Sequence, residues 1–160
     1  MTDSINSQID TLKSEANSYK KLGDYAKAEN CILKGLELKV NDNVLKHELA
    51  KIYFKREKYA GSLELLLDLS NKIKRRQILF KDIAMCYYKM NKLEKALEAV
   101  QISLSENSNN ISSLFVEGLI YREQGNFSES ISSFKRLLEL DSNNSCLLYT
   151  SDAADEHSCV

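Results

Sequence analysis

Apolar residues along most of this chain recur at alternating steps of three and four, which is the spacing of one face of an α-helix. The step is clearest in two segments, whose apolar residues are Leu63, Leu66, Leu67 and Leu93, Ala96, Leu97, Val100, Leu104. No stretch alternates apolar and polar residues clearly enough to indicate a strand. The pattern therefore predicts an all-α protein built from amphipathic helices.

The helical pattern also repeats along the chain. Tyrosines stand 34 residues apart, at Tyr19, Tyr53, Tyr87 and Tyr121. Three residues before each tyrosine stands a very small residue, namely Ala16, Ala50, Ala84 or Gly118. Six residues after each tyrosine stands a large residue, namely Tyr25, Tyr59, Leu93 or Phe127. Three residues further on stands a small one, namely Ala28, Ser62, Ala96 or Ser130. A fixed period of this length predicts a stacked array of structural repeats.

The period divides the chain into four frames, each expected to hold two helices. The frames are residues 9–42, 43–76, 77–110 and 111–144, with residues 1–8 leading into the first helix. The first helix of each frame is expected to end near Gly23-Asp24, Glu57-Lys58, Asn91-Lys92 and Gly125-Asn126, because Gly and Asn tolerate the left-handed backbone that closes a helix. We expect Asp24 and Asn126 to cap the following helices, the latter in a capping box with Glu129.

This pattern resembles the tetratricopeptide repeat family over residues 9–144. The match is most specific in the first and fourth frames, at Ala16, Tyr19, Gly23, Asp24, Tyr25, Ala28, Ile32 and at Gly118, Tyr121, Gly125, Asn126, Phe127, Ser130, Phe134, Leu140, Asp141. The chain lacks the family's early tryptophan and its end-of-repeat proline. The resemblance implies a right-handed superhelical solenoid of four stacked helix-turn-helix repeats, whose first helices line a concave groove.

The segment 145–160 falls outside the pattern and contains no lysine or arginine. Residues 146–151 are what TGT CTC TTA TAC ACA TCT encodes, and residues 152–156 are what GAC GCT GCC GAC GAR encodes. Those nucleotides closely resemble a transposase end sequence and the adjoining adapter used in preparing sequencing libraries. We therefore expect a non-native segment, the alternative being a polar disordered tail. On this expectation Cys146, His157 and Cys159 carry no function, and the native protein continues past Ser145.

Charge and cysteine usage narrow the class of protein. The segment 145–160 holds three of the 23 acidic residues, so the remaining chain has 22 basic and 20 acidic groups, too balanced for a dedicated nucleic-acid binder. The basic run 72–76 is interpreted as a solvated turn at a helix C-terminus.

Cys31 and Cys86 show no metal-ligand spacing and are expected to be buried free thiols of a reducing compartment. Without a secretory signal or a membrane span, the predicted location is cytoplasmic.

The sequence contains no recognisable motif of catalysis or cofactor binding. His47 has no carboxylate or cysteine partner evident in the sequence. There is no glycine-rich phosphate loop, nucleophile elbow or paired metal-ligand motif. We therefore expect no catalytic, cofactor or metal site in this stretch, and no enzymatic activity as the chain stands.

The resemblance places ten residues at groove positions of successive first helices: Lys20, Lys51, Phe54, Lys55, Met85, Tyr88, Lys89, Phe115, Leu119 and Arg122. The lysines are expected to meet carboxylates of a partner, and the aromatic and Met side chains to hold apolar anchors. Leu119, with Val116, has the alternative of packing against a further repeat.

Some members of the family grip a C-terminal Glu-Glu-Val-Asp tail of chaperones in a two-carboxylate clamp. Lys13 and Asn17 match its first pair, but the other places hold Glu48, Ile78 and Asp82. Two of these would repel the ligand's carboxylates, so we expect no binding of such tails.

The predicted function is a scaffold that binds a peptide or helix of a partner protein in the concave groove, with no nucleic acid or membrane as partner. One alternative is a substrate-recruiting repeat arm of a larger enzyme whose catalytic domain lies outside this chain. Another is a subunit of a larger assembly that uses the convex face as well.

Overall fold

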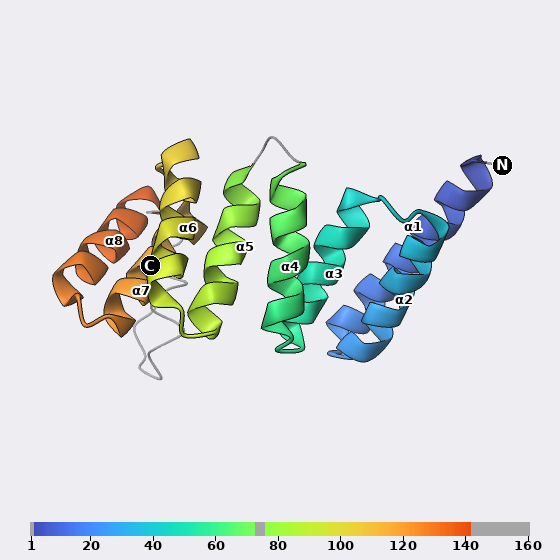
Figure 1. Ribbon diagram of the computed structural model, residues 1–160, viewed down its shortest axis with the longest axis horizontal. Coiled ribbons are helices and arrows are strands. Elements are labelled where there is room, and N and C mark those ends of the chain that lie inside the picture. The colour runs from blue at the N-terminus through green and yellow to red at the C-terminus, as the bar shows by residue number, and fades with distance from the viewer. Residues whose placement is uncertain (1, 73–75, 142–160) are drawn as a thin grey trace, which may run out of the picture.

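The computed structural model describes residues 2–72 and 76–141, and this part of the chain is entirely helical and irregular turn (Figure 1). Its eight helices are α1 (Thr2–Lys21), α2 (Tyr25–Leu38), α3 (Asn43–Lys55), α4 (Tyr59–Ser70), α5 (Arg76–Lys89), α6 (Leu93–Glu106), α7 (Ile111–Glu123) and α8 (Phe127–Leu140). They form four helical hairpins stacked side by side, which confirms the predicted all-α solenoid. The segment 145–160 and its expected non-native origin lie outside the described residues.

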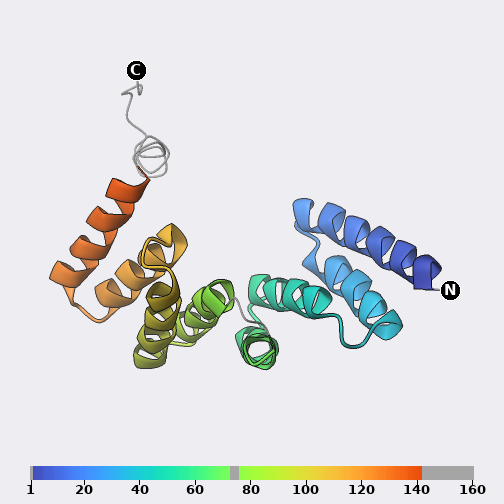
Figure 2. The ribbon, with the colours of Figure 1, turned by 90° about the horizontal axis from the view of Figure 1, so that it is seen from above.

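The hairpins curve into an arc when seen from above (Figure 2). The first helix of each hairpin, α1, α3, α5 and α7, lies on the inner side of the arc, and the second helix lies on the outer side (Figure 2). The side chains of the first helices therefore form the concave surface.

Very small residues sit where the two helices of a hairpin cross. Ala50 and Ala84 are fully buried, and a Cβ atom added to Gly118 would lie 2.7 Å from the ring of Phe134. In the second hairpin the Ser62 hydroxyl donates a hydrogen bond of 2.8 Å to the carbonyl oxygen of Ala50, and the fourth hairpin repeats this bond between Ser130 and Gly118. The expected close approach of the helices at these positions is confirmed.

The four hairpin turns share one backbone conformation. The residue at the same place in each turn has a positive φ, with values of 76° at Gly23, 59° at Glu57, 57° at Asn91 and 78° at Gly125. In every turn the next backbone N–H donates to the carbonyl oxygen of the repeated tyrosine at 2.9 Å. This bond satisfies a helix-terminal carbonyl that would otherwise lack a partner.

Glu57 is the turn residue least suited to this conformation, because a side chain with a Cβ atom is strained in the left-handed region. We expect Glu57→Gly to raise the free energy of unfolding by about 1 kcal/mol, since relief of the strain outweighs the extra freedom of glycine in the unfolded chain. Urea denaturation measures the change. Gly23→Ala is the reciprocal control and should lower stability by a similar amount. An unchanged midpoint for Glu57→Gly would contradict the assignment of strain.

The predicted caps of the second helices hold in one case and fail in the other. The Asp24 carboxylate accepts a hydrogen bond of 3.1 Å from the backbone N–H of Lys27, as expected. The Asn126 side chain makes no capping hydrogen bond, so the predicted capping box with Glu129 is wrong. The Glu129 carboxylate instead accepts a hydrogen bond of 2.6 Å from the Ser128 hydroxyl.

Two further caps lie at the start of first helices, where the sequence analysis did not place them. The Asp42 carboxylate accepts from the backbone N–H groups of Val44 and Leu45, at 2.9 and 3.1 Å. The Asn110 side chain accepts from the backbone N–H of Ser113 at 3.1 Å. These residues hold equivalent places two repeats apart and fix where α3 and α7 begin.

The hydrophobic core consists of two clusters that meet at α3. Leu49 of α3 belongs to the cluster shared with α1 and α2, whereas Ala50 belongs to the cluster that runs on through α4 to α7. Cys31 and Cys86 are buried free thiols, one in each cluster, as predicted. Burial raises the pKa of both thiols and so favours their neutral form.

Candidate binding groove

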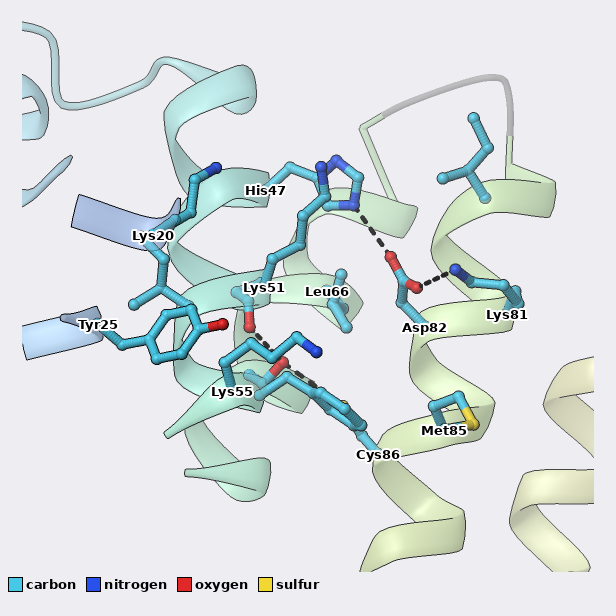
Figure 3. A pocket seen from close by; sticks show the side chains of 15 residues that line it. Lys20, Tyr25, His47, Lys51, Lys55, Leu66, Lys81, Asp82, Met85 and Cys86 are labelled. Carbon is cyan, nitrogen blue, oxygen red and sulfur yellow. Dashed lines mark hydrogen bonds and ion pairs between the residues drawn. The ribbon is translucent and has the colours of Figure 1, made fainter. Parts of the chain in front are cut away.

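The concave face is hollowed between α3 and α5 into a groove of about 580 Å³, called the main groove below (Figure 3). This volume is in the range of sites that bind ligands. Its lining residues come chiefly from the second and third hairpins and are Lys20, Tyr25, His47, Ala50, Lys51, Ile52, Phe54, Lys55, Ser62, Leu66, Ile78, Lys81, Asp82, Met85 and Cys86.

The floor of the main groove is part of the hydrophobic core. Ala50, Ile52, Leu66 and Cys86 are each at most 1% exposed. The Cys86 thiol donates to the Ser62 hydroxyl over 3.4 Å, and that hydroxyl donates in turn to the Ala50 carbonyl. The hydrogen bonds link α5, α4 and α3 beneath the groove, so the floor is formed before any ligand arrives.

Three apolar side chains that line the main groove are more exposed than this floor. The Phe54 ring packs edge-on against Tyr59 with 5.3 Å between ring centroids. Ile78 is 51% exposed, and Met85 is half-buried against the core. Apolar surface of this kind at the edge of a rigid floor can hold an anchoring side chain of a ligand.

Two of the predicted groove lysines share one carboxylate. The ammonium groups of Lys20 and Lys51 each lie 2.7 Å from an oxygen of Glu48. Burial alone would raise the pKa of the Glu48 carboxyl, but the hydrogen bonds from both lysines outweigh burial and lower it. Glu48 therefore stays ionised, and the three groups together carry one positive charge.

A second charge cluster spans the main groove from α3 to α5 (Figure 3). His47 Nε2 lies 3.2 Å from Asp82 Oδ2, and Lys81 Nζ lies 2.7 Å from Asp82 Oδ1. Burial alone would raise the pKa of the Asp82 carboxyl, but the His47 hydrogen bond and the Lys81 charge outweigh burial and lower it. No carboxylate partner of His47 is evident in the sequence, but the structure places Asp82 beside its ring. Its partner lies one repeat and one residue further along the chain.

A shallower C-terminal groove of about 360 Å³ continues the concave surface toward the last hairpin. Its lining residues are Lys81, Met85, Ile111, Ser112, Phe115, Val116, Leu137 and Asp141. Lys81 and Met85 line both grooves, so Met85 lies at their junction. An extended ligand in the main groove could reach the C-terminal groove past this side chain.

The structure brings six of the ten predicted site residues into these grooves. Lys20, Lys51, Phe54, Lys55 and Met85 line the main groove, and Phe115 joins Met85 in the C-terminal groove. The other four, Tyr88, Lys89, Leu119 and Arg122, line neither groove.

Tyr88 belongs instead to a separate polar cluster on α5 and α7. Its hydroxyl donates a hydrogen bond of 3.2 Å to Glu123, which also lies 3.5 Å from the Arg122 guanidinium. The Lys89 ammonium lies 5.9 Å from the centroid of the Tyr88 ring. Burial and the Glu123 carboxylate raise the pKa of the Tyr88 hydroxyl.

Tyr25 is a groove residue that the sequence analysis missed. It begins α2 yet reaches the main groove, where its hydroxyl points toward the lysine side chains (Figure 3). In the repeat pattern this position packs between helices, so the pattern could not predict that Tyr25 would line the groove.

Within residues 2–72 and 76–141, no group of three or more His, Cys, Asp or Glu side chains is arranged to hold a metal ion. No helix in this part of the chain is long and apolar enough to cross a membrane. Most of the basic run 72–76 lies outside the described residues or side chains. Its first member, Lys72, pairs with Asp68 at 2.7 Å.

Sequence models of the tetratricopeptide repeat match residues 14–42 and 112–144. These two stretches are tetratricopeptide repeats. The matches fall on the first and last hairpins of the array, and the two middle hairpins, which form most of the main groove, have the same pair of helices. No curated protein matches the chain in sequence.

Solved structures of other tetratricopeptide repeat proteins share the fold. MamA from Desulfovibrio magneticus superposes with a TM-score of 0.76 at 19% identity, over 86% of this chain and 77% of that one. A thermophilic repeat protein of Thermus thermophilus gives 0.75 at 19% identity, over 84% and 75%. YrrB, described as having an unusual peptide-binding site, gives 0.71 at 15% identity, over 89% and 73%.

Proposed function

We propose that this tetratricopeptide repeat array binds a peptide segment or helix of another protein along its concave face, centred on the main groove. The observation that carries the proposal is that the main groove has a floor of buried core residues bordered by lysine side chains, called the rim below. The rim consists of Lys20, Lys51, Lys55 and Lys81. A floor made of core residues needs little ordering when a ligand binds, which favours affinity. The peptide-binding site described for YrrB supports the proposal by likeness of fold.

The charges of the main groove indicate the chemistry of the partner. Four lysines line the main groove, and two carboxylates pair with three of them. With His47 neutral, these groups carry a net charge of two positive units: Lys20, Lys51, Lys55, Lys81, Glu48 and Asp82. We infer that the partner segment carries an apolar anchor for the floor and an acidic group for the rim. In a longer protein with a catalytic domain, the same groove would recruit that enzyme's substrate.

On this proposal we still expect no binding of the Glu-Glu-Val-Asp tails of chaperones. Glu48 and Asp82 place two carboxylates in the concave face, and each already holds the cations beside it. A tail with several carboxylates would have to compete with both. A segment with one acidic group could use Lys55, which forms no ion pair within the described residues.

The test begins with capture of a partner by the full chain from cells of its source, followed by kinetic measurement on the purified pair. Changing Lys51 and Lys55 together to Glu should slow association severalfold and flatten its dependence on salt, because exposed charges steer encounter more than they hold the complex. Lys95→Ala, on α6 and outside both grooves, is the control and should change nothing. If the lysine pair leaves binding intact and a convex-face change abolishes it, the assembly-subunit alternative replaces the groove.

A further inference from the structure

One lysine of the rim differs from the other three in its surroundings. The other three ammonium groups each lie 2.7 Å from a carboxylate oxygen of the main groove. Lys55, the last residue of α3, is exposed and forms no ion pair within the described residues. Its ammonium group points into the main groove (Figure 3). Lys55 is therefore the rim lysine whose charge is left for a ligand.

A neutral hydrogen-bond donor lies on the same side of the main groove. Tyr25 is half-buried at the start of α2 and lines the groove. Its hydroxyl forms no hydrogen bond within residues 2–72 and 76–141, and it points toward the lysine side chains of the rim (Figure 3). A phenolic hydroxyl can donate to an anion as an ammonium group does. The groove thus presents two donors, one charged and one neutral, that lack partners in this part of the chain.

The position of the Tyr25 hydroxyl is not a general property of the repeat. The same place in the following hairpins holds Tyr59, Leu93 and Phe127, and none of these lines either groove. The Tyr59 ring packs against Phe54 instead. Among the described hairpins, this place therefore brings a hydroxyl into the main groove in the first one alone.

The charges beside Lys55 limit what kind of anion it can bind. Glu48 stands seven residues before Lys55, so both lie on one face of α3, and the Glu48 carboxyl stays ionised. A ligand group with two negative charges would be repelled by this carboxylate more strongly than a group with one. One ammonium group and one neutral donor match a group that has a single negative charge and two acceptor oxygens, which is a carboxylate.

We propose that Tyr25 and Lys55 form a subsite for the carboxylate of an Asp or Glu side chain, an inference that rests on the proposed function. One oxygen of the carboxylate accepts a hydrogen bond from the Tyr25 hydroxyl, and the other accepts from the Lys55 ammonium group. Ile78 and Met85 line the groove from α5, on the side opposite Tyr25 (Figure 3). The acidic residue of the partner thus lies toward the first hairpin, and its apolar anchor lies toward the third.

Short random peptides displayed on phage and selected on the full chain supply the probe. The selected peptides should contain an Asp or Glu and should bind Ile78→Asn more weakly than the wild type. Ile78 lines the main groove and is 51% exposed, so this substitution removes an apolar contact and leaves the fold and the subsite unchanged. A selection that yields no binder, or binders that do not distinguish Ile78→Asn from the wild type, contradicts the proposed function and the subsite with it.

A double-mutant cycle on one selected peptide then tests the subsite itself. Tyr25→Phe and Lys55→Met should each raise the Kd of the acidic peptide about tenfold, which is the effect of one hydrogen bond to a charged group. Neither should change the Kd of the same peptide with its acidic residue replaced by the corresponding amide. Fluorescence polarisation measures both constants. Both substitutions keep the bulk of the side chain, and circular dichroism verifies the fold.

Tyr59→Phe and Lys89→Met are the matched controls, because they make the same changes at the same places of the next repeat, outside both grooves. They should leave the binding of both peptides unchanged. The subsite is overturned, with the groove intact, if peptides that need Ile78 contain no acidic residue. It is also overturned if Tyr25→Phe leaves the acidic peptide unaffected or weakens both peptides equally. Tighter binding of a phosphoserine peptide would overturn the assignment to a singly charged group.

Discussion

Replacing Ala84 by leucine is expected to lower the free energy of unfolding by about 1–3 kcal/mol, because the larger side chain overpacks the third hairpin. Ala84 and Ala96 are both fully buried in the core cluster between α5 and α6. The added isopropyl group can be placed only by separating the two helices or by forcing side chains off their rotamers. Urea denaturation followed by circular dichroism measures the loss.

Ala60→Leu is the matched control for this substitution. Ala60 is an exposed residue of α4, so the same added groups meet solvent there and should change stability little. A denaturation midpoint that is unchanged by Ala84→Leu would show that this position is not a helix crossing. That result would also contradict the equivalence of Ala50, Ala84 and Gly118 as helix-crossing positions.

Truncation of Met85 to alanine is expected to weaken binding of a captured partner by about 2 kcal/mol, roughly thirtyfold in Kd, chiefly through faster dissociation. Met85 lines both grooves, and its flexible thioether can adapt to an anchoring side chain. Surface plasmon resonance measures the change. A thermal melt of the variant is needed beside it, because Met85 also packs against the core.

Tyr88→Phe is the control on the same helix. It removes the hydroxyl that donates to Glu123 and keeps the ring, at a position outside both grooves. Binding should be unchanged. Should Tyr88→Phe weaken binding as much as Met85→Ala, the ligand would run over the cluster formed by α5 and α7 instead of through the main groove.

The fold could be predicted from the sequence because each repeat imposes the same constraints at the same places. The small residue at Ala50, the tyrosine at Tyr53 and the turn residue at Glu57 act locally, within one hairpin. A 34-residue period then presents these constraints four times, so an error in one repeat is corrected by the others. The middle hairpins could be recognised from the sequence for this reason.

The groove was less predictable because the period does not encode the angle between neighbouring hairpins. The predicted site positions assume equal spacing of all first helices, but α5 packs directly against α7 while the main groove opens between α3 and α5. Tyr88 and Arg122 therefore occupy groove positions of the repeat in the sequence, but their side chains do not line either groove in the structure.

Ion pairs between side chains of different repeats could not be predicted from the sequence either. Lys51 pairs with Glu48 within α3, but Lys20 reaches the same carboxylate from the first hairpin, because a long lysine side chain can span two repeats. The caps show the same limit on a smaller scale. The backbone angles at Asp24 and Asn126 are almost identical, with φ of −84° at both and ψ of 71° and 70°, yet only the first side chain caps its helix.

The floor of the main groove and its rim differ in how freely they can mutate. Leu66 and Cys86 belong to the core, so substitutions there endanger folding before they alter recognition. Lys51 and Lys55 are exposed, and most changes at exposed sites cost little stability. Over evolutionary time, partner preference could therefore drift through the rim while the scaffold stays constant. Related arrays could diverge in what they bind long before they diverge in shape.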